Sequence, residues 1–80
     1  MRRMEPPAGA PLATLRKRQL LSQRDLARQA GVALSTIYLI EAGKTERVTF
    51  KVMRAVSQAL NTPPESIAEF QRVIDADRRA

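Results

Sequence analysis

Cysteine, histidine and tryptophan are all absent from this 80-residue chain. Without cysteine there is no disulfide framework, no thiolate metal site and no thiol nucleophile. Without histidine the chain lacks the commonest general base and the commonest metal ligand. We therefore expect no enzymatic activity, no catalytic residue, no metal site and no cofactor.

Long apolar runs are also missing, since none approaches the roughly 18 residues that would span a bilayer. Two arginines near the start have no apolar stretch behind them, so a secretory signal is not expected. These absences predict a cytoplasmic protein without membrane contact. The length fits one small domain, and no second domain is expected to hold a small-molecule ligand.

Positive charge is present in excess, with 14 lysines and arginines against 8 aspartates and glutamates, a net charge of +6. The balance is +5 over residues 1–30, +2 over 31–60 and −1 over 61–80. This asymmetry favours an anion-binding face on the first two thirds of the chain, with nucleic acid as the first candidate. Small proteins also carry excess charge simply to remain soluble, so charge alone does not decide the function.

The chain divides into three parts. Residues 1–10 are expected to form a flexible arm, because the first 11 residues hold three of the five prolines and no periodicity. Residues 11–77 are expected to form one helical domain, followed by a short tail over 78–80. Five helices are predicted at about 11–20, 23–30, 34–41, 50–60 and 64–77. No alternating apolar pattern indicates a strand, so the fold class is all-α, a compact five-helix bundle.

Cap residues mark the ends of the middle helices. Ser22 and Asp25 form an S-x-x-D capping pattern, and Gly31 can adopt the left-handed conformation that ends a helix. Gly43 is expected to stop the third helix, and Thr49 to cap the fourth.

Apolar spacing predicts which faces are buried. In the fourth helix, apolar residues recur at i, i+3, i+6 and i+10 as a helical stripe. The residues expected to face inward are Leu12, Leu15, Leu26, Ala27, Ala30, Ile37, Ile40, Phe50, Met53, Val56, Leu60, Ile67 and Phe70.

Residues 23–41 form two short helices joined by a tight turn that contains glycine. Ala27 is small enough to let the helices cross closely, and Gly31 accepts a positive φ. Apolar residues are available to close the seam between the helices. The combination is a helix-turn-helix signature.

The stretch from Leu15 to Leu60 resembles the helix-turn-helix domain of the Cro and repressor proteins of lambdoid phages, the broad XRE-like regulator family. Three segments flanking the core of the motif match as well. They are Leu21-Ser22-Gln23, Ile40-Glu41-Ala42-Gly43-Lys44 and Ala59-Leu60. The resemblance covers about residues 12–70 and implies a lambda repressor-like DNA-binding domain.

The resemblance implies a sequence-specific regulator of transcription, acting as a repressor, whose third helix enters the major groove of double-stranded DNA. The positions implied to contact base edges are Ala33, Leu34, Ser35, Tyr38 and Leu39. Those implied to contact phosphates are Gln23, Thr36, Lys44 and Arg47.

Arg16 and Glu41 match a structural ion pair of some phage repressors, which ties the first helix to the third. Glu41 follows the apolar Ile40 and has no other obvious partner in the sequence. The alternatives for Arg16 are a solvated side chain or another phosphate contact.

The residues implied to contact base edges depart from the family pattern. Ala33 stands where Ser or Thr often caps the third helix. Leu34 and Leu39 stand where family members often place side chains that hydrogen bond to bases. Apolar groups can contact thymine methyls, and Ser35 can bond to either base type. We therefore expect modest specificity, dominated by backbone contacts and DNA shape.

Two kinds of protein partner are considered. In an alternative function, the fold is a protein-interaction module, such as an antitoxin or an adaptor, and the apolar surface of Leu34, Tyr38 and Leu39 binds a protein. In the leading function the chain is a homodimer, because Val73 and Ile74 exceed what the core needs. A symmetric dimer would place two recognition helices about 34 Å apart.

Overall fold

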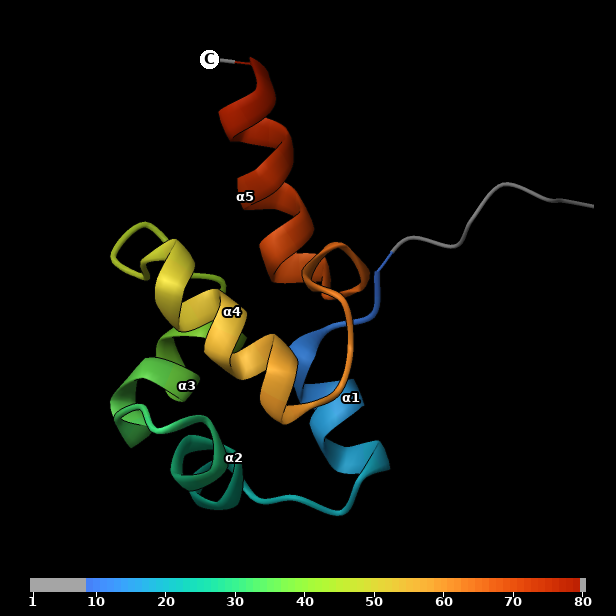
Figure 1. The fold of residues 1–80 in the computed structure, drawn as a ribbon, viewed down its shortest axis with the longest axis vertical. Helices are drawn as coiled ribbons and strands as arrows, with labels where there is room; N and C mark the ends of the chain where they lie inside the picture. Colours follow the sequence, from blue (N-terminus) through green and yellow to red (C-terminus); the bar gives the residue numbers. More distant parts are fainter. Residues whose placement is uncertain (1–8, 80) are drawn as a thin grey trace, which may run out of the picture.

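Short helices follow one another closely along this chain and pack around one core (Figure 1). The structure, a computed structural model, describes residues 9–79. The elements are α1 (Leu12–Arg18), α2 (Gln23–Ala30), α3 (Leu34–Glu41), α4 (Phe50–Ala59), the 3₁₀ turn η1 (Pro64–Ser66) and α5 (Ala68–Arg79). Within the described residues the only β pairing is one isolated bridge. The predicted all-α fold is confirmed.

The caps of the middle helices form as predicted. Ser22 Oγ accepts a hydrogen bond from the backbone N–H of Asp25 at 2.9 Å, and Asp25 Oδ2 accepts one from the N–H of Ser22 at 3.0 Å. The hydrogen bond from the backbone N–H of Ser22, as the largest cause, lowers the pKa of the Asp25 carboxyl. Gly31 ends α2 with φ 71°, and Thr49 Oγ1 accepts from the N–H of Val52 at 3.2 Å.

Helix α1 is shorter than the predicted span of 11–20. Leu20 has a φ of 59°, which lies in the left-handed region and terminates the helix. Its N–H donates to the carbonyl of Lys17, and the next N–H, that of Leu21, donates to the carbonyl of Arg16. The Leu20 side chain is 91% exposed.

The last predicted helix, 64–77, is two elements rather than one. Ile67 is extended (φ −105°, ψ 117°) and pairs with Ala10 in a parallel bridge. The N–H of Ala10 donates to the carbonyl of Ser66 at 3.2 Å, and the N–H of Ala68 donates to the carbonyl of Ala10 at 2.9 Å. Since Ile67 is also fully buried, tertiary pairing overrides the helical pattern at this residue.

Gly9 lies against the same segment. A Cβ at this position would come within 2.9 Å of the Ser66 carbonyl carbon, so only glycine fits. The folded unit therefore begins before residue 11, and the rest of the arm expected over 1–10 lies outside the described residues. At the other end, α5 continues to Arg79, into the stretch expected to be a tail, while residue 80 lies outside the described part.

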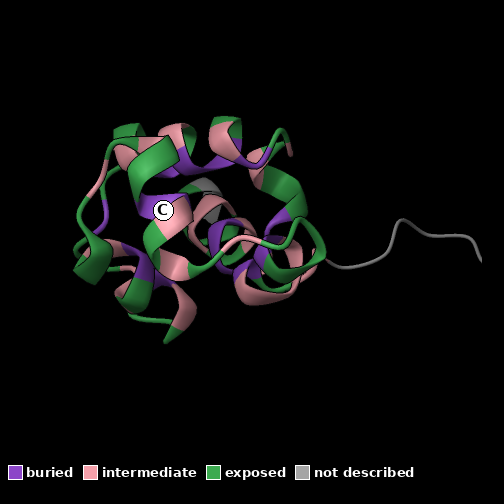
Figure 2. Ribbon diagram, turned by 90° about the horizontal axis from the view of Figure 1, so that it is seen from below, coloured by how far each residue is buried: buried purple, intermediate pink, exposed green. Residues whose placement is uncertain are grey.

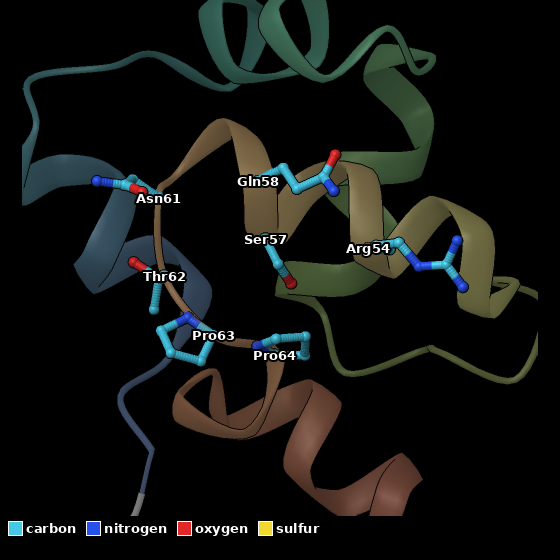
Figure 3. Close-up of a pocket in the computed structure, with 7 residues that line it drawn as sticks. All are labelled: Arg54, Ser57, Gln58, Asn61, Thr62, Pro63 and Pro64. Carbon is cyan, nitrogen blue, oxygen red and sulfur yellow. The ribbon is translucent and has the colours of Figure 1, made fainter.

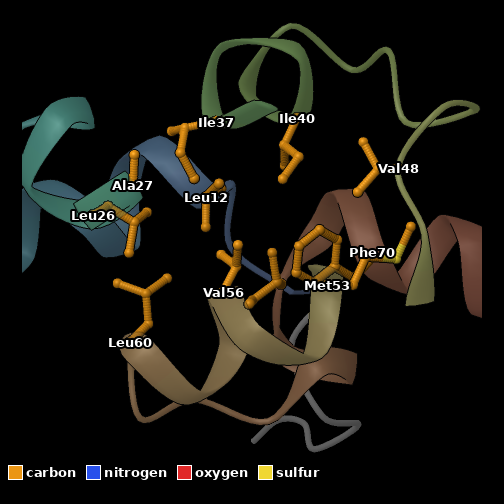
Figure 4. Packing of buried hydrophobic residues seen from close by; sticks show 11 residues of the cluster. Leu12, Leu26, Ala27, Ile37, Ile40, Val48, Met53, Val56, Leu60 and Phe70 are labelled. Carbon is orange, nitrogen blue, oxygen red and sulfur yellow. The ribbon is translucent and has the colours of Figure 1, made fainter. Parts of the chain in front are cut away.

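All five helices contribute side chains to the core, and their buried positions face the centre of the molecule (Figure 2). Figure 4 shows Ile37 and Ile40 of α3 above Val56 of α4, with Phe70 of α5 beside them. All four side chains are fully buried. Each such side chain contributes about 1.5–3 kcal/mol relative to an exposed one.

The predicted stripe of α4 holds for Met53, Val56 and Leu60 but is wrong for Phe50, which is 56% exposed. Phe50 is the first residue of α4, where no neighbouring helix covers it. It lines two surface hollows beside α5 instead. Ile74 on α5, which was expected to exceed what the core needs, is half-buried at one of these hollows.

The left-handed conformation of Leu20 is a strain that glycine would relieve. It costs an L-residue about 1–2 kcal/mol, while glycine adds about 0.5–1 kcal/mol of chain entropy loss. We expect Leu20→Gly to raise the free energy of unfolding by roughly 0.5–1 kcal/mol in urea denaturation. The control Leu20→Ala removes the exposed side chain but keeps the strain, so an equal gain from both variants would contradict the explanation.

Candidate nucleic-acid interface

The turn between α2 and α3 is built on Gly31. Its N–H donates to the carbonyl of Arg28 at 3.2 Å, and the N–H of Val32 donates to the carbonyl of Ala27 at 3.0 Å. The Ala27 side chain is only 4% exposed, because α3 packs directly on α2 at this point. A small residue at the crossing and a left-handed glycine in the turn produce the geometry of a helix-turn-helix.

Helix α3 has one buried face and one outward face. Ile37 and Ile40 are fully buried. All but one of the five residues expected to contact bases are exposed; the exception, Leu39, is half-buried. Leu34 is 41% exposed and Tyr38 is 64% exposed, and their i, i+4 spacing places both on one side of the helix.

The start of α3 lacks a side-chain cap, since Ala33 is its N-cap residue and forms no side-chain hydrogen bond. The extended backbone at Ala33 instead lets its carbonyl accept from the N–H of Thr36 at 3.0 Å. No side-chain oxygen therefore caps the first N–H groups of α3. This is the position at which a helix-turn-helix approaches DNA.

Arg16 and Glu41 lie in contact between α1 and α3. Arg16 Nε is 2.7 Å from Glu41 Oε2, and Nη2 is 3.2 Å from Oε1. Arg16 Nη1 also donates to the carbonyl of Leu21 at 2.8 Å. Each side chain of the pair is only 10% exposed, so neither is a solvated surface charge. Three of the five N–H donors of the guanidinium are therefore engaged within the protein, and little of the group reaches solvent.

Gln23 joins the same pair. Its Nε2 donates to Glu41 Oε1 at 2.9 Å, so the side chains of three helices meet at one carboxylate. Burial raises the pKa of Glu41, but hydrogen bonds from Arg16 and Gln23 and the charges of Arg16 and Lys17 outweigh it and lower the pKa overall. Gln23, implied by the resemblance to meet a phosphate, has one amide hydrogen engaged within the protein. Its backbone N–H remains at the N-terminus of α2, where anions are favoured.

The other implied phosphate contacts lie on or just after α3. Lys44 and Arg47 are exposed in the α3–α4 loop, and Thr36 is half-buried on α3. The loop leaves α3 at Gly43, whose φ is 80°, and the N–H of Lys44 donates to the carbonyl of Leu39 at 2.9 Å. Among residues 9–79, neither cation of this loop forms a salt bridge.

Helix α2 adds further positive charge. Arg24 and Arg28 are exposed on it. Arg28 lies 3.8 Å from Asp25, but both side chains are largely solvated, so this pair is weak. The candidate interface therefore combines an uncharged, partly apolar outward face on α3 with cations on the adjoining α2 and loop.

Glu69 has a structural role that the sequence analysis did not predict. Although it is acidic, it is only 7% exposed. Its Oε1 accepts from the N–H of Leu12 at 2.9 Å and so caps α1, whose N-cap residue Pro11 offers no side-chain oxygen. No local pattern could reveal this cap, because the two partners are 57 residues apart.

A surface hollow at the C-terminal end of α4 lies apart from this interface (Figure 3). No residue of α2 or α3 lines it. Two of its hydroxyls are already engaged, because Ser57 donates to the carbonyl of Met53 and Thr62 to that of Leu60. In the described part of the chain, no three acidic side chains gather as a metal-ion set. Over the same residues, no helix is long and apolar enough to cross a membrane.

The family comparison agrees with this geometry. The model of the family described as "Helix-turn-helix domain" matches residues 8–70, and the chain belongs to that family. The matched range therefore includes the bridge between Ala10 and Ile67. Membership in a helix-turn-helix family indicates DNA binding. Comparisons with curated proteins and with solved structures gave no match.

The Arg16–Glu41 contact makes a pH-dependent contribution to stability. We expect Glu41→Gln to lower the free energy of unfolding by about 1.5–3 kcal/mol near neutral pH, because a buried guanidinium loses its charged partner. Since the folded pKa of Glu41 is lowered, the wild type keeps this contribution above the ordinary glutamate pKa of about 4.3 and loses it as the pH falls further.

Urea denaturation of both proteins at a series of pH values measures the effect. The free energies of unfolding of the wild type and of Glu41→Gln should converge in acid. The difference between them isolates Glu41, because other carboxylates such as Asp25 contribute equally to both proteins. A difference that stays constant from neutral pH into acid would contradict the proposed role of the Glu41 charge.

Proposed function

We propose that this protein is a sequence-specific DNA-binding regulator of transcription, of the repressor type, which inserts α3 into the major groove. The observation that carries the proposal is the outward face of α3, held in a fixed orientation by the contact of Arg16, Glu41 and Gln23. A helix that enters a groove needs a fixed orientation relative to the rest of its domain. This contact holds α3 against both α1 and α2.

The charge around α3 supports the same function. Lys44 and Arg47 follow α3, while Arg24 and Arg28 lie on α2. Cations that precede and follow the uncharged outward face of α3 along the chain suit the phosphate backbones that border a groove. In this arrangement the cations supply affinity and register, and repression follows from occupying a site that polymerase needs.

Salt dependence tests this proposal. We expect wild-type affinity for duplex DNA to fall steeply with salt in a fluorescence-anisotropy titration, with a log–log slope of about −0.9 for each phosphate neutralised. Arg47→Ala should weaken binding to all sequences alike and reduce the slope by about 1. The matched control is Arg54→Ala, an exposed arginine of α4 outside the α2–α3 unit and the loop, which should leave the slope unchanged. Binding that does not respond to salt would overturn the proposal.

We further propose that the regulator acts as a homodimer joined through α5 and Phe50. The outer half of α5 extends away from the body of the molecule (Figure 1). Phe50 is 56% exposed and shares one hollow with Val73 of α5 and another with Ile74. The hollow with Val73 is also lined by Thr45 and other residues of the α3–α4 loop. A dimer contact here would lie next to the loop that carries the phosphate-binding cations.

The charges of α5 suit a second copy in antiparallel orientation. A two-fold axis between Val73 and Ile74 places Arg72 of each chain opposite Asp75 of the other. Both of these charged side chains are exposed. A two-fold interface is self-complementary, so each such pair occurs twice. The helix is only about 18 Å long at 1.5 Å per residue, so the contact is small and we expect DNA to strengthen it.

Removing the Phe50 side chain tests the dimer. We expect Phe50→Ala to raise the dimer dissociation constant at least about tenfold in sedimentation experiments, since one buried phenylalanine contributes about 1.5–3 kcal/mol. The fold should persist, because the side chain lies largely outside the core. Leu20→Ala, which removes an exposed apolar side chain elsewhere, is the control. A wild type that remains monomeric both free and on DNA would exclude the dimer.

A second candidate function is favoured by the exposure of Leu34 and Tyr38. An outward helix face with two large apolar side chains is suited to a protein partner, as in an antitoxin or an adaptor. The salt titration separates the two functions. A wild type without salt-dependent DNA binding would leave the protein-interaction module as the function of this face.

A further inference from the structure

We propose that α3 recognises the C5 methyl groups of thymine, so that the target is a duplex with thymines at the contacted positions of each half-site. This inference rests on the proposed DNA-binding function and names the chemistry by which the site selects its DNA. It follows from what the outward face of α3 contains and from how the amide of Gln23, on the adjoining α2, is held.

The outward face of α3 has little capacity to read base edges by hydrogen bonding. Within the described residues, its outward positions hold no charged and no amide side chain. Bidentate contacts of Arg or Lys to guanine, and of Asn or Gln to adenine, are therefore not available from this face. The hydroxyls of Ser35 and Tyr38 both donate and accept, so they fit either base type and discriminate weakly.

One amide of the adjoining α2, that of Gln23, is already engaged. Gln23, on α2, donates from Nε2 to Glu41 Oε1 at 2.9 Å, and Glu41 is in turn held by Arg16 at 2.7 Å. Turning this amide towards a base would remove a hydrogen bond from a carboxylate that is only 10% exposed. The energetic cost of a lost charged hydrogen bond opposes that movement. Gln23 therefore serves to orient α3 and does not replace the missing base-reading side chains.

What α3 does present is apolar surface at its leading end. Leu34 is the first residue of the helix and is 41% exposed, and Tyr38 follows one turn later at 64% exposure. In the major groove the apolar group on a base pair is the C5 methyl of thymine. An aliphatic side chain against any other edge would remove water from a polar atom without replacing its hydrogen bond. Leu34 therefore favours thymine and also disfavours the other bases.

The experiment removes the C5 methyl groups from the DNA and leaves the rest of the duplex unchanged. Sites are first selected from a duplex pool whose randomised centre spans about 20 base pairs, enough for two half-sites. The enriched site is then synthesised with thymine, with uracil, or with 5-bromouracil, whose bromine occupies the place of the methyl. Uracil keeps the base pairing and the phosphates, so only the methyl contacts are lost.

We expect thymine enrichment in the selected site and about a fourfold loss of affinity for each contacted thymine that uracil replaces, which corresponds to about 0.8 kcal/mol per buried methyl-sized group. Bromouracil should restore the affinity, and the salt slope should be the same for all three duplexes. Leu34→Ala should reduce the ratio of thymine to uracil affinity, whereas the control Leu20→Ala, on the α1–α2 connection, should not.

The outcomes separate this inference from the function on which it rests. If the thymine and uracil duplexes bind equally and in a salt-dependent way, methyl recognition is overturned while DNA binding stands. If the pool shows no salt-dependent binding at all, both the proposed function and methyl recognition are overturned.

Discussion

The contact of Arg16 with Glu41 is the interaction on which the DNA-binding surface depends. Glu41 ends α3 at the negative pole of the helix, where a carboxylate is unfavourable unless it is compensated. Burial makes compensation obligatory, because an unpaired charge in this position would cost several kcal/mol. Arg16 supplies the charge from α1 and Gln23 a hydrogen bond from α2. The same atoms that neutralise the carboxylate therefore fix α3 against two other helices.

A second constraint joins the two ends of the described chain. The backbone of Gly9 and Ala10 runs against Ser66 to Ala68, and Glu69 caps α1. These contacts hold the N-terminal end of α5 against the start of the described chain and α1. The C-terminal half of α5 has no comparable hydrogen bonds among the described residues. The exposed Phe50 lies beside that C-terminal half. A fold that closes tightly at one end of α5 thus leaves an apolar surface at the other, which is the surface that we propose for a dimer contact.

The proposed interface divides affinity and selectivity between different residues. In that proposal, cations of α2 and of the α3–α4 loop attract phosphate without regard to sequence. The outward face of α3 is left to apolar and hydroxyl groups, with Leu34 at its leading end. Selectivity from such a face depends on contact with the methyl groups of thymine. It also depends on the free-energy cost of removing water from polar base edges without replacing its hydrogen bonds. The protein is therefore expected to bind DNA broadly and to prefer its sites by a modest margin.

The sequence by itself determined the features that depend on neighbours within a few residues. The Ser22–Asp25 cap, the left-handed Gly31 and the helical class all follow from local spacing, and so does the helix-turn-helix. The tertiary structure alone decided where distant segments meet. Ile67 is extended and pairs with Ala10, and Glu69 is buried at the start of α1. Gln23 is hydrogen-bonded to Glu41, and Phe50 is exposed. These outcomes depend on partners tens of residues away, because the free energy of a long-range contact is set by the packing of the whole chain and not by the local sequence around either partner.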